Sequence, residues 1–482
     1  MKLKTFLILI ACSAIAVNSL AQDFSPFVKG FIKVQADTFS LAIAEVIDGT
    51  GAPVEHHQTI LVEDGKIAAM GTVSSMHLPP GIKIIDCTGK TIIPGMIMMH
   101  EHLFYGELAG YDNAKHSFSF YVGQEMPLSF PMLYLAGGVT AMRTTGSIQA
   151  GTDLYVSEQI REGKIPGPDM DVTAPYIEGP GVDVIGPLRI KNAGEAVREV
   201  DYWASMGCTS VKLYEDLTRA EARAAIDAAH RNRLKVTGHL SSITYREAAD
   251  MGIDNLEHGF YMCSDFDAGK KEDSADEQGR EQSLSKMDEH SPAMKALMAY
   301  LIKKGVTVTS TLPVFLSYSG REVFPGGADS AVTPVIGDQV RQFWQYARSI
   351  DSVTIARYKK ELFWEKQFAD MGGKLMAGID PTGAGRVIPG YADRIVPELL
   401  MEAGFTLPQA IKICTFNAAE YLGKERETGS IAVGKRADLV LMDGDAEKNI
   451  ESMRKTEIVF RNGTGYDSPK IFQWTKGLVG LY

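Results

Sequence analysis

The stretch of sequence that decides the fold runs Pro94-Gly95-Met96-Ile97-Met98-Met99-His100-Glu101-His102-Leu103. Its apolar run predicts a buried β-strand that ends in two histidines two positions apart. Side chains at positions i and i+2 of a strand point the same way, so His100 and His102 should project together. Glu101 should face the opposite layer, where we expect it to form a structural ion pair. Two adjacent imidazoles suit a transition metal such as Zn²⁺, although a lone His-x-His pair is often accidental.

Four more polar residues lie at or near the ends of predicted strands and strengthen this interpretation. They are Lys212 on strand 210–214, His239 ending 234–239, His258 ending 253–258 and Asp380 ending 374–380. A helix at 219–232 and a strand at 306–311 continue the alternation that a parallel sheet requires. We therefore predict an α/β fold, a (β/α)₈ TIM barrel, whose active site lies at the C-terminal ends of its strands.

Both flanks of this α/β region are rich in short strands and turns. The clearest is a hairpin at 59–70, whose Asp64-Gly65 pair suits a type I′ turn. The same pattern returns near the other end of the sequence. We predict one small β-sandwich domain assembled from residues 34–93 and 429–470, with the barrel between them at 94–428.

Residues 264–290 interrupt the alternation of strands and helices. They are charged, poor in apolar residues and without a clear period, which predicts a solvated or disordered insertion. Because the insertion follows His258, it would lie over the barrel mouth and is placed to serve as a lid.

The composition restricts the partners of the protein. Among 482 residues, 49 are Lys or Arg and 60 are Asp or Glu, which gives a formal net charge of −11. An acidic chain has no general attraction for nucleic acid or anionic lipid. We expect a small molecule or small peptide as substrate, and a homo-oligomer is one open alternative for the assembly.

The first 21 residues have the pattern of a signal peptide. Lys2 and Lys4 precede the apolar stretch 6–17, and Ser19-Leu20-Ala21 is a small-x-small cleavage site. This pattern predicts export to the periplasm or the extracellular space. The alternative is a lipobox that would leave a lipid-anchored Cys12. No later segment is long and apolar enough to cross a bilayer.

Four cysteines would remain after cleavage, and they are scattered along the chain: Cys87, Cys208, Cys263 and Cys414. No C-x-x-C pair occurs among them. We predict separate buried thiols, with a disulfide as the alternative in an oxidising compartment.

Several motifs together resemble the amidohydrolase superfamily over about residues 39–463. They are Pro-Gly-Met-Ile before His100-x-His102, Val211-Lys212-Leu213-Tyr214, Thr237-Gly238-His239, Leu256-Glu257-His258-Gly259, Gly378-Ile379-Asp380 and the tail 429–440. Within the superfamily, the sequence is most similar to imidazolonepropionase-like proteins and metal-dependent dipeptidases. The motifs are specific for the fold, less so for the chemistry, and weak for the substrate.

The resemblance implies a site with two divalent metal ions, for which Zn²⁺ is the expected metal. His100 and His102 would hold one ion, and His239 and His258 the other. Asp380 would bind the first metal and accept a hydrogen bond from a bridging water. It would then act as the catalytic base and carry the proton to the leaving nitrogen.

The resemblance also assigns a role to Lys212, which is a poor ligand as an ammonium. In similar enzymes the matching lysine reacts with CO₂, and the resulting carbamate bridges both metals. The alternative is a structural cation paired with Glu215 or Asp216.

Residues near strand ends are candidates for binding the substrate: Tyr105, Arg143, Tyr176 and Tyr214. Arg143 could bind a carboxylate through two hydrogen bonds. For each of the four, packing or a salt bridge is an equal alternative. His116, His230 and His290 match no motif, and we interpret them as surface or core residues, whereas His56 and His57 lie in the predicted β-domain, away from the barrel mouth.

The sequence thus favours an exported metal-dependent hydrolase that cleaves a C–N bond in a small peptide or N-acyl amino acid. One alternative is a cyclic-amide hydrolase with a single working metal. Another is an exported protein that binds metal without being an enzyme.

Overall fold

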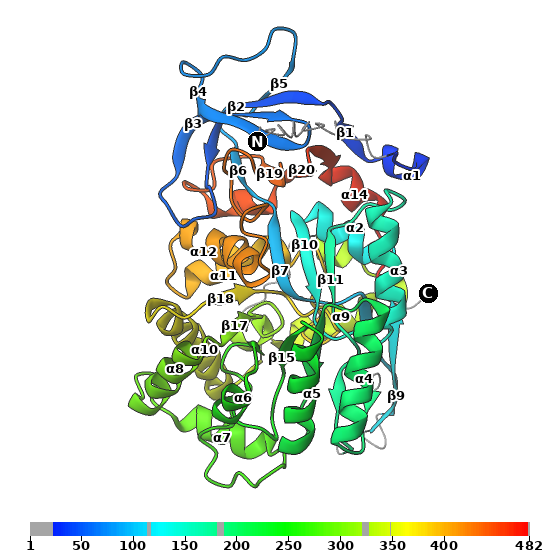
Figure 1. Cartoon of the computed structure of the whole chain (residues 1–482), viewed down its shortest axis with the longest axis vertical. Helices are drawn as coiled ribbons and strands as arrows, with labels where there is room; N and C mark the ends of the chain where they lie inside the picture. The colour runs from blue at the N-terminus through cyan, green and yellow to red at the C-terminus, as the bar shows by residue number, and fades with distance from the viewer. Residues whose placement is uncertain (1–22, 113–116, 181–187, 321–326, 348, 481–482) are drawn as a thin grey trace, which may run out of the picture.

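The computed structural model describes residues 23–112, 117–180, 188–320, 327–347 and 349–480. The predicted signal peptide, with Cys12, lies outside the described residues, and so does His116. Figure 1 shows strands from both flanks at one end of the molecule and the α/β region below them. No described helix has the length and apolar character that a bilayer crossing needs.

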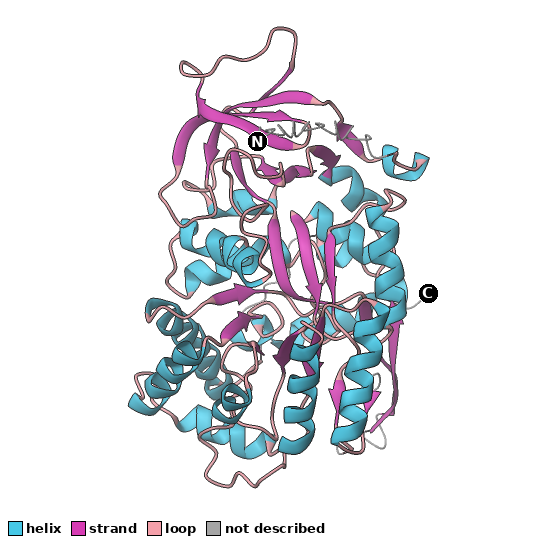
Figure 2. Cartoon of the chain, viewed as in Figure 1, coloured by secondary structure: helices cyan, strands magenta, loops and turns pink. Residues whose placement is uncertain are grey.

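The α/β region is built on parallel strands with helices packed around them (Figure 2). The strands form a three-stranded sheet, β11-β10-β7, and a seven-stranded sheet, β13-β12-β14-β15-β16-β17-β18. Their bounds are β7 (Met96–Glu101), β10 (Val139–Thr144), β11 (Asp169–Val172), β12 (Ile177–Glu178), β13 (Leu188–Arg189), β14 (Ser210–Leu213), β15 (Lys235–Gly238), β16 (Asn255–Glu257), β17 (Thr307–Ser310) and β18 (Leu375–Ala377). The predicted mixed α/β fold is confirmed, and the predicted strands lie within three residues of these bounds.

Backbone hydrogen bonds join the two parallel sheets at both junctions. At the β11–β14 junction, Ala174 N donates to Ser210 O over 2.9 Å. At the β18–β7 junction, Ile379 N and Asp380 N donate to His100 O over 3.2 and 3.0 Å. The C-terminal ends of β7 and β18 therefore lie side by side, which brings His100 next to Asp380.

Helices connect the strands and cover them. They are α2 (Ser129–Ala136), α3 (Ala150–Arg161), α4 (Ala193–Met206), α5 (Arg219–Arg231), α6 (Tyr245–Met251), α7 (Glu277–Lys286), α8 (Pro292–Lys304), α9 (Pro334–Ala347), α10 (Ser352–Asp370), α11 (Val396–Glu402), α12 (Leu407–Cys414) and α13 (Phe416–Tyr421). Local chemistry sets their limits. Thr218 and Glu221 form a capping box at the start of α5, and Gly207 ends α4 with φ 103°.

The strands of both flanks belong to one nine-stranded sheet, ordered β1-β21-β20-β19-β6-β2-β3-β4 with β5 beside β2. The bounds are β1 (Ile32–Val34), β2 (Thr38–Val46), β3 (Glu55–Glu63), β4 (Lys66–Thr72), β5 (Lys83–Asp86), β6 (Thr91–Pro94), β19 (Leu439–Met442), β20 (Thr456–Arg461) and β21 (Thr464–Asp467). Two short helices accompany it, α1 (Pro26–Lys29) and α14 (Ser468–Trp474). Asp64 and Gly65 have φ 48° and 74°, as the predicted type I′ turn requires. The pairings define one sheet, so the second layer of the predicted sandwich stays a prediction.

Two segments differ from the expectations. Residues 264–290 contain the helix α7, and Leu284 and Arg280 on it are buried. The segment is therefore not disordered, although much of it is exposed. An antiparallel hairpin, β8 (Phe104–Asp112) with β9 (Ser117–Glu125), follows β7 and was not predicted.

All four cysteines of the described chain are free and buried. The prediction of separate buried thiols is confirmed, and the disulfide alternative is wrong.

Candidate metal centre

Side chains from the ends of β7, β16 and β18 converge on one point. His100, His258 and Asp380 each offer a ligand atom within 4.8 Å of the other two. Asp380 Oδ1 lies 3.4 Å from His100 Nε2 and 3.2 Å from His102 Nε2. Imidazole nitrogen and carboxylate oxygen are donors that Zn²⁺ accepts. These donors therefore fit a metal ion.

Two of these residues have an unusual backbone conformation. His258 has φ 65° and Asp380 has φ 55°, both in the left-handed region that glycine favours. Each follows the last residue of a strand or lies shortly beyond it. Such a conformation costs on the order of 1–3 kcal/mol and persists where the surrounding structure holds it. Here it turns both side chains toward His100, against the alternation of the strand.

Hydrogen bonds fix the rings of His100 and His102. His100 Nδ1 is 2.7 Å from Glu257 Oε2, and His102 Nδ1 donates to Gly146 O over 2.8 Å. Because a carbonyl oxygen only accepts, the proton of His102 lies on Nδ1, and Nε2 presents its lone pair toward Asp380. Burial lowers the pKa of His102 to about 4, which keeps the ring neutral and able to bind metal.

Glu257 is held by a buried polar network below the metal ligands. Arg143 Nη2 and Asn255 Nδ2 each donate to Glu257 Oε1 over 2.7 Å, and Thr237 Oγ1 donates to it as well. Burial alone would raise the pKa of Glu257, but His100 and Arg143 outweigh it and lower the pKa to about 2. The sequence reasoning missed Glu257. Its two-residue spacing from Asn255 on one strand was the available signal.

This network favours the salt-bridge alternative for Arg143. Its guanidinium donates to Met99 O and to Glu257, and the side chain is fully buried. Arg143 holds Glu257 in place, and Glu257 in turn orients the ring of His100. This placement does not support a contact between Arg143 and substrate.

His239 and His258 form the second pair of predicted ligands. His258 Nδ1 is 2.8 Å from Thr311 Oγ1, and its Nε2 is 3.0 Å from His239 Nδ1. His239 Nε2 lies 3.1 Å from Glu215 Oε1, and 15% of the His239 side chain is exposed. Burial lowers the pKa of both histidines. Both rings are therefore neutral at pH 7 and close enough to share one ion.

Lys212 lies at the centre of the site. Its Nζ is 3.3 Å from His100 Nε2 and 4.8 Å from the centre of the Tyr176 ring. Among the described residues no carboxylate lies within 4.0 Å of Nζ, which disfavours the pairing with Glu215 or Asp216. Burial lowers the pKa of Lys212 to about 8.

The three predicted tyrosines lie in different places. Tyr176 stacks on His102 with ring centres 5.9 Å apart, and Tyr214 packs against His239 at 4.7 Å. The ring centres of Tyr176 and Tyr214 are 5.1 Å apart, so the two tyrosines form an aromatic wall beside the proposed ligands. Tyr105 is fully buried against Phe130, which is a packing role.

The prediction for Glu101 was wrong in part. The side chain is buried on the far side of β7, as expected, but no cation of the described chain lies within 4.0 Å of its carboxylate. Glu101 Oε1 accepts a hydrogen bond from Ile379 N over 3.1 Å instead. Burial, followed by nearby Asp393, raises the pKa of Glu101 well above its usual range.

The remaining described histidines lie outside the centre. His230 on α5 pairs with Asp254 at 3.0 Å, and His290 pairs with Glu289. His56 and His57 on β3 face Glu45 in the flank sheet.

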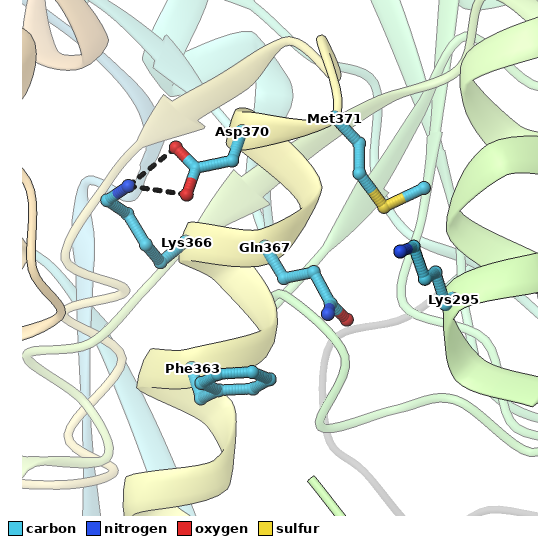
Figure 3. Close-up of a pocket in the computed structure, with 6 residues that line it drawn as sticks. All are labelled: Lys295, Phe363, Lys366, Gln367, Asp370 and Met371. Carbon is cyan, nitrogen blue, oxygen red and sulfur yellow. Dashed lines mark hydrogen bonds and ion pairs between the residues drawn. The ribbon is translucent and has the colours of Figure 1, made fainter. Parts of the chain in front are cut away.

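A cavity of about 290 Å³ opens elsewhere, between α8 and α10 (Figure 3). It is lined by Lys295, Phe363, Lys366, Gln367, Asp370 and Met371. None of the converging ligands lines it, so we do not assign the active site there.

Comparison with known proteins relates part of the chain to one family. Residues 365–470 match the amidohydrolase family. The enamidase of Eubacterium barkeri is 33% identical over 106 residues, 22% of this chain and 24% of that protein. The chain thus matches about a quarter of the length of this relative.

Solved structures extend the likeness to most of the chain. A putative prolidase from Bifidobacterium longum covers 91% of this chain and 99% of its own, with a TM-score of 0.64 and 21% identity. A Xaa-Pro dipeptidase with bound methionine in its active site covers 89% of this chain and 100% of its own, with a TM-score of 0.63 and 18% identity. At these identities the structures share the fold. Together the comparisons confirm the resemblance to the amidohydrolase superfamily.

Proposed function

We propose, from the resemblance to the amidohydrolase superfamily, that the protein is a metal-dependent hydrolase cleaving a C–N bond in a small peptide or N-acyl amino acid. One observation carries this proposal: His100, His102 and Asp380 present two imidazole nitrogens within 3.4 Å of one carboxylate oxygen at the strand ends. The prolidase and dipeptidase names of the structural relatives support the choice of substrate.

The expected ligands would hold two divalent ions. His100, His102 and Asp380 would hold the first ion, and His239 and His258 would hold the second. Bound Zn²⁺ would lower the pKa of a water molecule and polarise the scissile carbonyl. Lys212 would bridge the two sites as a carbamate. Only the neutral amine attacks CO₂, forming an N–C bond and releasing a proton, and the lowered pKa of Lys212 favours that form.

Asp380 is the residue that moves the proton. Burial alone would raise its pKa, but His100, His102 and His258 outweigh it and hold the pKa well below its usual range. The ionised carboxylate accepts a proton from the attacking water as the water oxygen bonds to the carbonyl carbon. It gives that proton to the departing nitrogen as the C–N bond breaks, which yields a carboxylic acid and an amine.

A second function is favoured by a separate observation. The cluster of ligand atoms within 4.8 Å contains three residues, His100, His258 and Asp380, which is enough for a single ion. A cyclic-amide hydrolase with one working metal is therefore the alternative. An exported protein that binds metal without catalysis is the third candidate, and only an activity assay separates it.

The remaining proposals concern organisation. We propose that the two parallel sheets are arcs of one (β/α)₈ barrel at 94–428, which their backbone hydrogen bonds support. Residues 34–93 and 429–470 form its β-domain.

We also propose export after cleavage at Ala21. A protein isolated from its host that begins near Gln22 would support export, whereas an intact Met1 in the cytoplasm would contradict it.

The proposed function is tested by metal analysis beside a substrate screen. Purified protein should contain two equivalents of Zn²⁺ and hydrolyse members of a panel of dipeptides and N-acyl amino acids. His100→Ala should lose most activity and at least one equivalent of metal, whereas the surface variant His230→Ala should lose neither. Full activity with one tightly bound metal, on a cyclic amide, would favour the alternative.

A further inference from the structure

Arg280 is a buried cation that the insertion 264–290 places beside the candidate metal centre. It lies on α7, and only 4% of it is exposed. Its Nη1 is 3.3 Å from Ser241 Oγ, and Ser241 follows the ligand His239 by two residues. Lys270 of the same insertion donates to Ser242 O over 2.5 Å. Two cationic side chains of the insertion thus hold the loop that leaves β15.

The charge of Arg280 has little compensation in the protein. Among the described residues, the one carboxylate within 4.0 Å is Glu277, at 3.6 Å with its side chain 74% exposed. An ion pair with so exposed a partner contributes little. Arg280 Nε is buried and has no hydrogen-bond partner in the described structure. A guanidinium taken out of water needs a charged or hydrogen-bonding partner, so this one is prepared for an anion.

The contact with Ser241 places this guanidinium on one side of the centre. Ser241 follows the proposed ligand His239 by two residues, and its Oγ accepts a hydrogen bond from Arg280 Nη1 over 3.3 Å. An anion bound at Arg280 would therefore lie on the His239 side of the site.

We propose that Arg280 binds a carboxylate of the substrate and makes the protein selective for substrates that end in a free carboxylate. This inference rests on the proposed function. The planar guanidinium binds a carboxylate through two parallel hydrogen bonds, whereas a carboxamide offers one acceptor and no charge. Dipeptides and N-acyl amino acids meet this requirement, and their C-terminal amides do not.

The competing explanation is that Arg280 only tethers the insertion to Ser241. A tether affects every substrate alike, whereas a receptor distinguishes an acid from its amide. The test therefore compares Arg280→Met and Arg280→Lys with the control Arg246→Met. Arg246 is an exposed residue at the start of α6, and its guanidinium stacks on the ring of Tyr300. Ser241→Ala keeps the charge and removes the hydrogen bond.

The experiment measures kcat/KM for the best dipeptide of the screen and for its C-terminal amide. Arg280→Met should lower the value for the acid by roughly 10- to 100-fold and leave the amide within about twofold, because a hydrogen-bonded charge pair is lost. Arg280→Lys should restore part of the preference, and Arg246→Met should match wild type. An unchanged acid-to-amide ratio in folded Arg280→Met would overturn the proposal. If that variant does not fold, an acid-to-amide ratio in Arg280→Lys equal to that of wild type would overturn it equally, because an ammonium cannot form the two parallel hydrogen bonds. Ser241→Ala should leave this ratio unchanged, and a ratio that falls in Ser241→Ala as far as in Arg280→Lys would favour the tether.

A binding measurement separates this proposal from the proposed function. Calorimetry with N-acetylmethionine and its amide on zinc-loaded protein should show binding of the acid alone, lost in Arg280→Met. If wild type binds the acid through Arg280 but hydrolyses nothing, the proposed function is refuted and the carboxylate site at Arg280 still stands. Equal binding of acid and amide by wild type would refute the receptor.

Discussion

The two histidine pairs of the candidate metal centre are held in different ways. His100 and His102 are almost fully buried, and each Nδ1 has a fixed partner in Glu257 and in Gly146 O. His239 and His258 contact each other at 3.0 Å, and His239 is partly exposed beside Glu215. The first pair rests on a buried charge network inside the fold. In the second pair His258 is also buried, and the insertion reaches the chain two residues beyond His239 through the contact between Arg280 and Ser241.

This difference indicates a rigid half and an adaptable half. A ligand whose orientation is fixed before metal binds loses little entropy on binding and holds its ion tightly. In the second half, one ring nitrogen of each histidine is engaged with the other ring, so the pair must separate before an ion enters. We expect the first half to fill first and to release its ion last.

The largest effect should follow a change to Asp380, the proposed proton carrier. Asp380→Asn keeps the size of the side chain and removes the base, so kcat should fall by roughly 10³- to 10⁴-fold. Metal content measured by plasma spectrometry should change much less than in His100→Ala. Activity within tenfold of wild type would exclude Asp380 as the proton carrier.

A change at Lys212 tests whether the halves are linked. Lys212→Ala should lose the second equivalent of metal together with activity, and short carboxylic acids should restore part of both. Lys212→Arg should also fail, because guanidinium stays positive beside two cations. Two bound metals and near-normal activity in Lys212→Arg would mean that Lys212 is only a structural cation.

A matched pair of carboxylate changes sharpens the comparison. Glu257→Gln should weaken metal binding in the first half by about 10- to 100-fold, since the carboxylate orients His100. Glu215→Gln should have a smaller effect. Glu178→Gln is the control, because Glu178 is a buried acid at the end of β12 that, among the described residues, accepts hydrogen bonds from backbone amides alone. Equal losses in all three would indicate general destabilisation.

The smallest expected effect is a pH dependence of the metal-free protein. His102 has a folded pKa of about 4, below the unfolded value of 6.5. The unfolded chain therefore binds a proton first as pH falls, and stability drops between pH 6.5 and 4 by roughly 3 kcal/mol from His102 alone. Urea unfolding at pH 7 and pH 5 should reveal this drop. His102→Asn should reduce it, and His230→Asn at the surface should not.

The sequence was sufficient to predict the strands and the polar residues at their ends, because these follow a simple pattern of apolar and polar residues. His100, His239, His258 and Asp380 were predicted at strand ends because apolar runs mark buried strands and polar residues mark where they stop. The structure brings all four together. The left-handed φ of His258 and Asp380 was not predictable, because a non-glycine residue adopts it only where tertiary contacts impose it.

The supporting residues were harder to foresee. Arg143 was a candidate for binding substrate because it ends a strand, with a salt bridge as the equal alternative. The sequence left this choice open, because the neighbouring strands decide whether an arginine projects beyond the strand ends or lies beneath them. The ion pair between Glu257 and Arg143 is visible only in the folded structure, because the two residues are 114 positions apart in the sequence. Residues 264–290 lack a hydrophobic period, yet buried Leu284 and Arg280 anchor α7 to the rest of the protein.

The pairing of the flank sheet has a consequence for how the chain is made. β19 pairs with β6, and β21 pairs with β1, so strands from the start of the chain need partners from its end. On the ribosome, β6 would emerge on the order of 20 to 70 s before β19 at ordinary rates of synthesis. During that interval the edge of β6 has no partner and is open to wrong pairing. A nascent chain stalled before residue 439 should therefore resist protease in the α/β region and remain cleavable in β1–β6.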